Sequence, residues 1–463
     1  MRTQTCGVAA CLLAFGRGVL ALNTATLLRR QAPEPSRQTL DNSLDLQYSG
    51  NFTVGNQIIR GIIDTGSFEF VLFSKNCGVS CGVAGKFDEH ASSSFVAGPH
   101  SMVQEYGSGS CESQDATDAV GVLGLSTQRQ DMWLAKTCGM PLLDTAFFNA
   151  IVGVGPPGQP AYMAEWNIKQ MQTTVDQFQA LNETVPESIV AEKQAAEQEL
   201  QAVTGKRALL ENLNVRTFSI CLGKQSGSSG SMTWNDHYRA GQPGVLRLAV
   251  AGEITWGLKL GSVGLGSKTF ACEAESCVGV VDSGTSMIGL SSSAYMAVYQ
   301  ALTSGDYSMD CSDLSHFPDL SFTLGGQQLS LPPSAYIGST HGKMSAEVAA
   351  YMSRRHLGEP GVSTPTPCEL LLMDLGEQTT TLGSMWVLGM PFFRQYYTTF
   401  DLGNGKGDRS VLVMPPSPTC EPDLQPTLQT FRTRNKEDVT PRQIDASKIM
   451  LPRWLHKRKG RKP

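Results

Sequence analysis

Two segments of the sequence share a pattern that can place a pair of carboxylic acids at the ends of buried strands. GIIDTGSFEF carries Asp64, and GVVDSGTSMI carries Asp282, 218 positions further along the chain. In each segment two apolar residues lead into a turn whose glycine permits a tight backbone and leaves the acid at the strand end. Two carboxyls a hydrogen bond apart share one proton, because both cannot ionise cheaply. The pattern therefore predicts general acid–base chemistry, in which one acid activates a water and the other donates a proton.

The elements that must position these acids repeat as well. An apolar pair followed by glycine occurs once after each acid, as IVG at 151–153 and as VLG at 387–389. Such a strand can lie close against the turn that carries the acid. Ser67 and Thr285 each stand three positions after an acid, where a hydroxyl can hydrogen-bond the outer carboxyl oxygen. One Asp-Thr-Gly triplet is an ordinary turn, but the repeated arrangement indicates two related halves with one acid each.

The sequence resembles the pepsin-like aspartic peptidases from LDLQY at 44–48 to Asp401 in TTFDLGNGKG. Further motifs lie between these ends: QEYGSGS at 104–110, FSICLG at 218–223 and ITWGLKLGSV at 254–263. The residue types of these motifs, their order and their spacing all agree with the family. The resemblance implies a mainly β, bilobal fold with a helical insertion, in which each lobe donates one acid to a cleft between the lobes.

The resemblance also implies roles for individual residues. Asp64 and Asp282 would be the catalytic acids, and the hydroxyls of Thr65 and Ser283 would brace the two turns across the lobes, with Ser67 as a further support. The residues expected to contact substrate are Tyr106, Gly107 and Ser108 in a mobile hairpin, together with Gly66, Gly284 and Thr285. The implied activity is an endopeptidase for polypeptides with an acid optimum and apolar residues around the scissile bond. No cofactor is implied.

Two features depart from the family. FEFV at 68–71 stands where the family usually has a tryptophan, so the usual hydrogen bond to the hairpin tyrosine is expected to be absent. Residues 24–43, between an expected signal peptide and the first strand, are fewer than the family's inhibitory prosegment. Zymogen behaviour is therefore in doubt.

The cysteines suit an oxidising compartment. Of the 12 cysteines, two lie in the expected signal peptide, which leaves an even number for disulfides. The resemblance implies the pairs Cys77–Cys81, Cys272–Cys277 and Cys311–Cys368. Cys111 and Cys138 are candidates for another pair, and Cys221 is interpreted as a buried thiol. The cysteines lack the paired spacing and histidines of a zinc site, so no metal is expected.

The following organisation is expected: a signal peptide at 1–23, a short prosegment or linker at 24–43, an N-terminal lobe at 44–217 with a partly helical insertion at 161–215, a C-terminal lobe at 218–415, and a basic, disordered tail at 416–463. The insertion is rich in helix-forming residues, and Ile189, Leu200, Val203 and Leu210 are expected to face the body. A membrane-anchoring start is the alternative to a signal peptide. Partner docking or a cleavable linker is the alternative to a solvated insertion, and membrane-surface or sorting roles are the alternatives for the tail.

Composition excludes several functions. With 41% hydrophobic and 17% charged residues, 47 Gly and 24 Pro, the chain is typical of short strands and tight turns. A net charge of −5 is too balanced for bulk binding to nucleic acid. Beyond the first 25 residues no apolar stretch reaches the length of a membrane span. A monomer of the secretory pathway is expected, either secreted or in a lysosome or vacuole, and the sequons at Asn51 and Asn182 fit that route.

Two other functional classes are alternatives. A catalytically silent homologue would bind a peptide, protein or sugar in the cleft, but such relatives usually lose an acid or the hairpin tyrosine, and this chain has all three. A thiol or serine hydrolase requires a histidine in a suitable motif, and the seven histidines are scattered. Inhibition by a statine-type peptide would discriminate between these classes.

Overall fold

The computed structural model describes residues 34–455 except 240, 306, 308–310, 353–356, 358–367, 418 and 421–434. The expected signal peptide, the first half of the short prosegment or linker, and parts of the basic tail lie outside the described residues. None of the helices in the described part combines the length and the apolar composition that crossing a membrane requires.

Most of the regular structure is β, as expected. The strands of the first half are β1 (Ser36–Ser43), β2 (Gln47–Val54), β3 (Gln57–Asp64), β4 (Phe70–Phe73), β5 (Val96–Tyr106), β6 (Gly109–Val122), β7 (Leu125–Gly139) and β8 (Ala150–Gly153). The following strands are β9 (Thr217–Cys221), β10 (Gly230–Trp234), β11 (Leu246–Ala249), β12 (Gly257–Leu265), β13 (Lys268–Ala271), β14 (Cys277–Val281), β15 (Ile288–Leu290), β16 (Leu320–Leu324) and β17 (Gln327–Leu331). The last strands are β18 (Ile337–His341), β19 (Glu369–Leu370), β20 (Leu372–Asp374), β21 (Thr379–Thr380), β22 (Gly383–Leu388), β23 (Tyr397–Asp401), β24 (Ser410–Met414) and β25 (Arg442–Asp445). The helices are α1 (Gln159–Ala180), α2 (Glu187–Val203), α3 (Leu209–Asn212), α4 (Ser292–Thr303), α5 (Ala346–Ala349) and α6 (Met390–Gln395).

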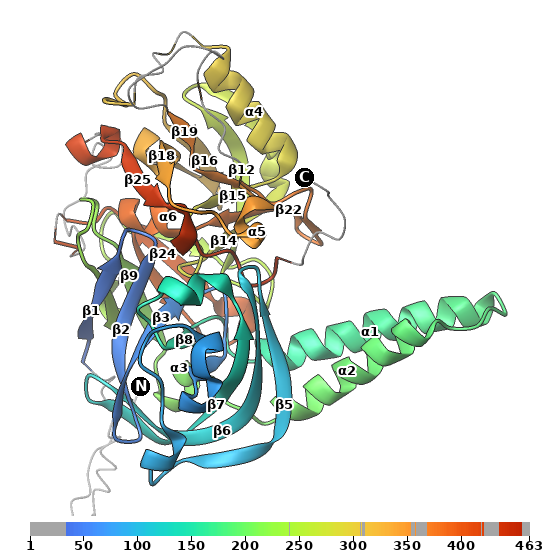
Figure 1. Ribbon diagram of the computed structural model, residues 1–463. Coiled ribbons are helices and arrows are strands. Elements are labelled where there is room, and N and C mark those ends of the chain that lie inside the picture. Colours follow the sequence, from blue (N-terminus) through green and yellow to red (C-terminus); the bar gives the residue numbers. More distant parts are fainter. Residues whose placement is uncertain are drawn as a thin grey trace, which may run out of the picture. The chain divides into compact units, whose positions relative to one another are not determined.

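The largest described sheet has 13 strands in the order β11-β24-β23-β9-β10-β1-β2-β3-β8-β4-β7-β6-β5 (Figure 1). A second sheet of nine strands follows the path β17-β16-β12-β14-β22-β15-β20, with β13 and β21 beside it. In the first sheet β1 pairs antiparallel with β10, so strands from both halves of the sequence are continuous there. Residues 36–43, which were expected to belong to a short prosegment or linker, are therefore paired with the folded body.

Each acid follows a strand with the same local pairing. β3 ends at Asp64 and runs parallel to β8, which pairs antiparallel with β4. β14 ends just before Asp282 and runs parallel to β22, which pairs antiparallel with β15. A Cβ at Gly153 would lie 2.5 Å from the backbone of Phe68, and one at Gly389 would lie 2.1 Å from a carbonyl oxygen. The glycines are therefore needed for close approach, and the sequence repeat folds into the same three-stranded arrangement once in each sheet.

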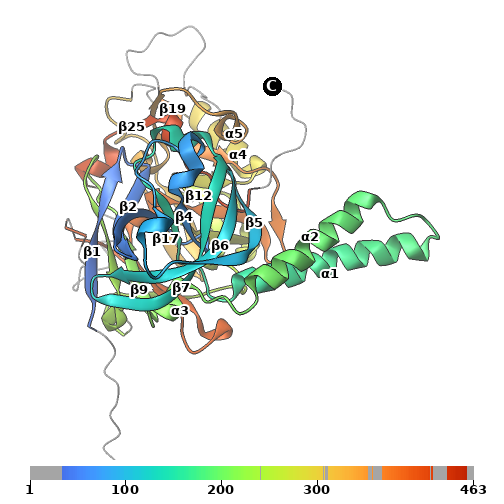
Figure 2. The same ribbon diagram turned by 60° about the horizontal axis from the view of Figure 1, so that its bottom comes forward.

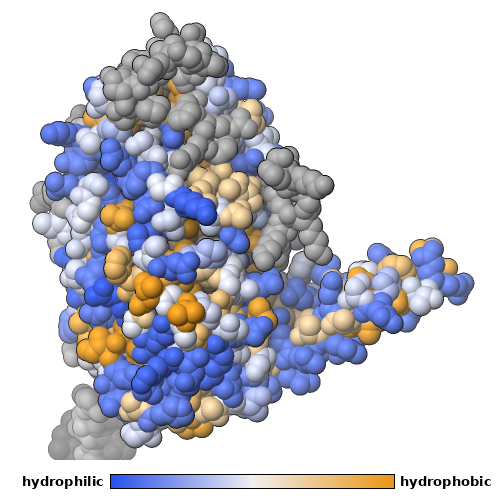
Figure 3. All heavy atoms as spheres, viewed as in Figure 1, coloured by the Kyte–Doolittle hydropathy of each residue, from blue (hydrophilic) through white to orange (hydrophobic). Residues whose placement is uncertain are grey.

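The expected helical insertion is present as α1, α2 and α3. Helices α1 and α2 contact each other and form a hairpin that projects from the sheets in both views (Figures 1 and 2). Val203 and Leu210 belong to the main hydrophobic core, whereas Ile189 and Leu200 are half-buried. Hydrophilic side chains cover most of the hairpin, with scattered apolar ones between them (Figure 3). This surface is typical of a solvated helix pair.

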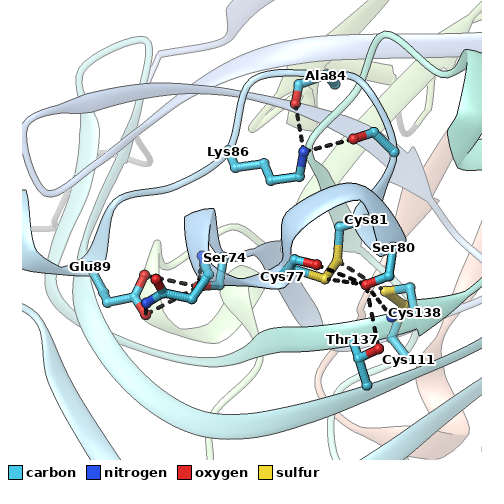
Figure 4. Close-up of a disulfide and its surroundings, with 12 residues drawn as sticks. Ser74, Cys77, Ser80, Cys81, Ala84, Lys86, Glu89, Cys111, Thr137 and Cys138 are labelled. Atoms are coloured by element: carbon cyan, nitrogen blue, oxygen red, sulfur yellow. Dashed lines mark hydrogen bonds between the residues drawn. A yellow bond between two sulfur atoms is a disulfide. The ribbon is translucent and has the colours of Figure 1, made fainter.

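Five disulfides join the described cysteines. They are Cys77–Cys81, Cys111–Cys138, Cys221–Cys420, Cys272–Cys277 and Cys311–Cys368. The first two lie side by side near Ser80 (Figure 4), with the sulfurs of Cys81 and Cys138 3.4 Å apart. The interpretation of Cys221 as a free thiol is wrong, because it bonds a cysteine 199 positions away.

The chain after Cys420 differs from the expected disordered tail. Within it, β25 runs parallel to β18, with Gly338 opposite Arg442. The Arg442 guanidinium forms a buried ion pair with Asp45 at 2.8 Å. A 3-10 helix, Ala446–Lys448, follows, and Lys448 Nζ donates to the Thr145 carbonyl at 2.6 Å. The expectation of disorder is wrong for residues 435–455, because their backbone and side chains are bonded to the body.

Candidate active site

The two acids lie in contact. Asp64 is 7% exposed and Asp282 is 1% exposed, and the Asp64 carboxylate lies close enough to raise the pKa of Asp282. A Cβ at Gly66 would lie 2.6 Å from the Asp282 carboxyl, and one at Gly284 would lie 2.2 Å from Oδ1 of Asp64. Each acid therefore rests on the glycine of the other acid's turn, where a larger residue would displace it.

Each carboxyl is held by one hydroxyl and one backbone amide. Ser67 Oγ donates to Oδ2 of Asp64 at 2.6 Å, and Thr285 Oγ1 donates to Oδ2 of Asp282 at 2.6 Å. The amide two residues after each acid donates to its Oδ1, at 2.9 Å for Asp64 and 2.8 Å for Asp282. These four donors fix the carboxyl planes and favour the ionised form.

The two turns are braced against each other through buried hydroxyls. Ser283 N donates to Thr65 Oγ1 at 2.9 Å, and Thr65 N donates to Ser283 Oγ at 3.2 Å. The same hydroxyls donate onward, from Thr65 to the Val281 carbonyl at 2.9 Å and from Ser283 to the Ile63 carbonyl at 2.7 Å. The strand ends that carry the acids are thus bonded directly to each other.

Burial is the main influence on the protonation of Asp282. It raises the pKa of Asp282 well above its ordinary value, and the neighbouring Asp64 carboxylate raises it further. Hydrogen bonds from Thr285 and Gly284 oppose the shift without cancelling it. The arrangement therefore favours a state in which the pair keeps one proton.

The β5–β6 hairpin carries the tyrosine that is expected at the site. Tyr106 lies opposite Gly109 in the ladder, so Gly107 and Ser108 form the tip. Burial, and to a smaller extent the nearby Asp64 carboxylate, raise the pKa of Tyr106. Its hydroxyl is buried and makes no hydrogen bond with the described residues, consistent with the missing tryptophan.

The C-terminal segment, defined as residues 446–455, lies between the hairpin tip and the Asp282 turn. Met450 N donates to Ser286 Oγ at 2.9 Å, and Ser286 N donates to the Met450 carbonyl at 3.1 Å. Leu451 N donates to Ser108 Oγ at 2.9 Å, and Gly107 N donates to the Pro452 carbonyl at 3.1 Å. The backbone of this segment is therefore bonded both to the hairpin and to the turn of the second acid.

The next side chain of this segment enters the site itself. Arg453 forms an ion pair with the buried carboxylate of Glu69, and its Nη2 donates to Oε1 at 2.5 Å. The guanidinium also lies 4.5 Å from the ring centre of Phe68 and 5.3 Å from that of Tyr106. Burial lowers the pKa of Arg453 to about 10, although the Asp64 carboxylate opposes the shift. A charged side chain of the chain itself thus lies beside the acid pair.

The structure brings together every acid, hydroxyl, glycine and hairpin residue expected at the site. The residues that the sequence analysis did not assign to the site are Glu69, Ser286 and Arg453. Glu69 had a detectable signal, because it is a charged residue inside the apolar run FEFVLF. The other two had none, since their contacts join distant parts of the chain.

Among the described residues, the cysteines 77, 81 and 138 form the grouping whose ligand atoms are close enough for a metal ion. Their sulfurs are bonded in disulfides, so they are not available as thiolate ligands.

Known proteins share this sequence pattern over most of the chain. The chain is 26% identical to pepsin A of Bos taurus over 393 residues, which cover 82% of this chain and 88% of the bovine protein. It is 27% identical to pepsin A of Gallus gallus over 385 residues, covering 81% and 87% of the two proteins. Renin of Rattus norvegicus is 26% identical over 384 residues, covering 79% and 80%. A family model described as eukaryotic aspartyl protease matches residues 47–408, and the chain therefore belongs to the eukaryotic aspartyl protease family.

Proposed function

We propose that this chain is an endopeptidase that hydrolyses polypeptides with a water activated between Asp64 and Asp282. The observation that carries the proposal is the pair of buried, neighbouring carboxyls, each held by a hydroxyl and an amide. With one proton between them, one carboxyl can accept a proton from water while the other donates to the substrate carbonyl. Neither acid is assigned the role of base, because the titration belongs to the coupled pair.

The electrostatics support an acid optimum. Burial and the Asp64 charge raise the pKa of Asp282, so the shared proton is retained in acid and is lost as the pH rises. The activity is therefore expected to be high in acid and to fall as the pH rises.

The hairpin and the Asp282 turn offer a binding path for an extended peptide. Gly107 N, Ser108 Oγ and both polar groups of Ser286 already bond a peptide backbone, that of the C-terminal segment. Closure of the hairpin over a substrate would exclude water and strengthen the interactions inside. Apolar side chains are accepted along this path in our proposal, since Leu451 packs in a cluster that includes Met287.

The surroundings of the reaction are proposed on chemical grounds. Five disulfides suit an oxidising compartment, and the sequon residues Asn51 and Asn182 are both exposed. We propose a monomer of the secretory pathway that acts outside the cell or in an acidic compartment such as a lysosome or vacuole. The chemistry of the acid pair requires neither a metal nor an organic cofactor.

The decisive experiment incubates the purified chain with a denatured protein across a range of pH and sequences the fragments. Asp64→Asn and Asp282→Asn are each expected to abolish cleavage at about pH 4 while the fold is retained, and a chelator is expected to leave the rate unchanged. A statine-type peptide should inhibit, because its hydroxyl stands in for the attacking water. Cleavage that persists in both variants would contradict the proposal. Binding of the statine-type peptide without cleavage at any pH would favour the catalytically silent alternative.

A further inference from the structure

Glu69 is a buried carboxylate whose cationic partner comes from the far end of the chain. Its side chain is 4% exposed, and Arg453, 15% exposed, is its ion-pair partner. Within the described ranges no other cation forms an ion pair with Glu69. The body of the protein thus contains a desolvated negative charge that the C-terminal segment neutralises.

The surroundings of Glu69 suit a planar cation. The rings of Phe68 and Tyr106 flank the guanidinium at 4.5 and 5.3 Å, and such aromatic faces attract cations. Phe68 and Glu69 directly follow Ser67, whose hydroxyl holds Asp64, so the pocket adjoins the first acid. The residues that bind Arg453 therefore also border the reacting groups.

The backbone before Arg453 is held as a bound peptide would be. Met450 exchanges two hydrogen bonds with Ser286 on one side, and Leu451 and Pro452 bond the hairpin tip on the other. Gly107 and Ser108 at this tip are residues for which the family resemblance implies a contact with substrate. Arg453 thus occupies the position of a side chain presented by a bound polypeptide.

We propose that Glu69 forms a subsite for an arginine or lysine side chain of a polypeptide substrate, and that Arg453 fills this subsite as an internal pseudosubstrate. The inference rests on the proposed endopeptidase function and adds a substrate class to it. When the C-terminal segment leaves, Glu69 is left without a counter-ion, which is costly for a buried charge. A basic side chain restores the pair, whereas an apolar side chain leaves it unpaired. Arginine should be preferred to lysine, because its planar fork suits both the carboxylate and the rings.

The alternative is that Glu69 merely anchors the C-terminal segment. Other contacts already do this: Arg442 pairs with Asp45, β25 pairs with β18, and Lys448 bonds the Thr145 carbonyl. None of these contacts involves the acid pair or the hairpin tip. The two accounts differ in one consequence, since an anchor alone predicts that substrate choice is independent of Glu69.

The first arm of the test measures amide hydrogen exchange of residues 446–455 in the full-length chain. Asp64→Asn is present throughout, so the result does not depend on catalysis. Arg453→Met, similar in length but uncharged, is expected to speed exchange at least about tenfold, and Arg453→Lys by clearly less. Adding Glu69→Gln to Arg453→Met should change little further, because the pair is already broken. If residues 446–455 are equally protected from exchange with methionine and with arginine at position 453, the proposal is overturned, because the pocket would then accept an apolar side chain as well as a cation.

The second arm measures substrate choice in the catalytically intact full-length chain with Arg453→Met, which frees the subsite. Two quenched peptides are compared that differ only in arginine or norleucine at one position, and the position is chosen from the cleavage map of a denatured protein. The arginine peptide is expected to have a kcat/KM at least about tenfold higher, and Glu69→Gln should remove most of this preference. The matched control is Asp115→Asn, which breaks another buried ion pair, with Lys206 at 2.7 Å, and should leave the preference unchanged.

The outcomes separate the two proposals. A preference that is the same with and without Glu69→Gln overturns the subsite. If neither peptide is cleaved by any variant, the endopeptidase function fails, and the exchange arm alone then decides whether the Glu69 pocket selects a cation.

Discussion

Asp45→Asn should destabilise the protein at neutral pH and have little effect in strong acid. Burial disfavours the Asp45 charge, but Arg394 and Arg442 outweigh it and lower the pKa from 3.8 to about 2. A depressed acid pKa contributes stability above about pH 4, and this stability is lost as the pH falls through the folded-state value. The size of the depression corresponds to about 2.5 kcal/mol in the free energy of unfolding. Asparagine keeps the shape and tolerates the left-handed backbone at this position, with φ of 62°.

The assay is urea unfolding followed by tryptophan fluorescence at pH 7, 5, 3 and 2. Asp64→Asn is carried in every chain so that self-digestion in acid does not intervene. The difference in stability between chains with and without Asp45→Asn should be largest at pH 7 and should shrink toward pH 2, where the Asp45 carboxyl protonates. The control is Asp88→Asn, which breaks the ion pair with Lys75 at the surface and should have no measurable effect. A destabilisation of equal size at pH 7 and pH 2 would refute the reasoning.

Three further outcomes concern the acid pair. Asp282→Asn should abolish activity and make the stability of the fold less sensitive to rising pH. The pKa of Asp282 is higher in the folded chain than in the unfolded chain, so this acid stabilises the fold at low pH and loses that contribution as the pH rises. Thermal unfolding from pH 4 to 8 measures the difference. Thr65→Val should cost about 2 to 4 kcal/mol of unfolding free energy in urea, since it leaves the Ser283 amide and a carbonyl unpaired. Gly284→Ala should lower kcat/KM about a hundredfold or more, because its Cβ would lie 2.2 Å from Oδ1 of Asp64.

Each of these three predictions can be contradicted by a specific result or tested against a control. A pH dependence of stability that is identical in the Asp282→Asn chain would show that this acid is not the one with the raised pKa. Thr65→Ser keeps the hydroxyl and should recover most of the stability, so equal losses in Thr65→Val and Thr65→Ser would exclude the hydrogen bonds as the cause. Gly85→Ala is the control for the glycine, because a Cβ there meets nothing within 4 Å.

The paired acid motifs could be predicted from sequence because their requirements are local. An apolar strand, an acid, a glycine and a hydroxyl must follow one another in a fixed order, and Gly153 and Gly389 are required by contacts that a Cβ would block. Because this order occurs twice, the sequence predicted that Asp64 and Asp282 lie close together. The helical insertion was equally local, since its composition favours a helix without any partner.

The features that escaped prediction depend on contacts between distant residues. Cys221 lies in an apolar run, which is typical of a buried free cysteine. Its disulfide partner is 199 positions away and comes close only in the folded chain. The basic composition of the tail indicates a solvated chain, but Ile449 and Leu451 are apolar residues buried in one cluster. Ser286 and Ser108, which bond the C-terminal segment, lie 164 and 343 positions from their partners.

The Cys221–Cys420 disulfide has a consequence for how an internal pseudosubstrate behaves once displaced. It joins the chain to β9 at a point 22 residues before Arg442. A displaced C-terminal segment therefore remains covalently tethered to the body. A binding group on such a tether has an effective concentration on the order of millimolar at its site. Displacement by a substrate would then be reversible, and Arg453 would return to Glu69 when the substrate is consumed. Irreversible release of Arg453 would require cleavage of the backbone between Cys420 and Arg453.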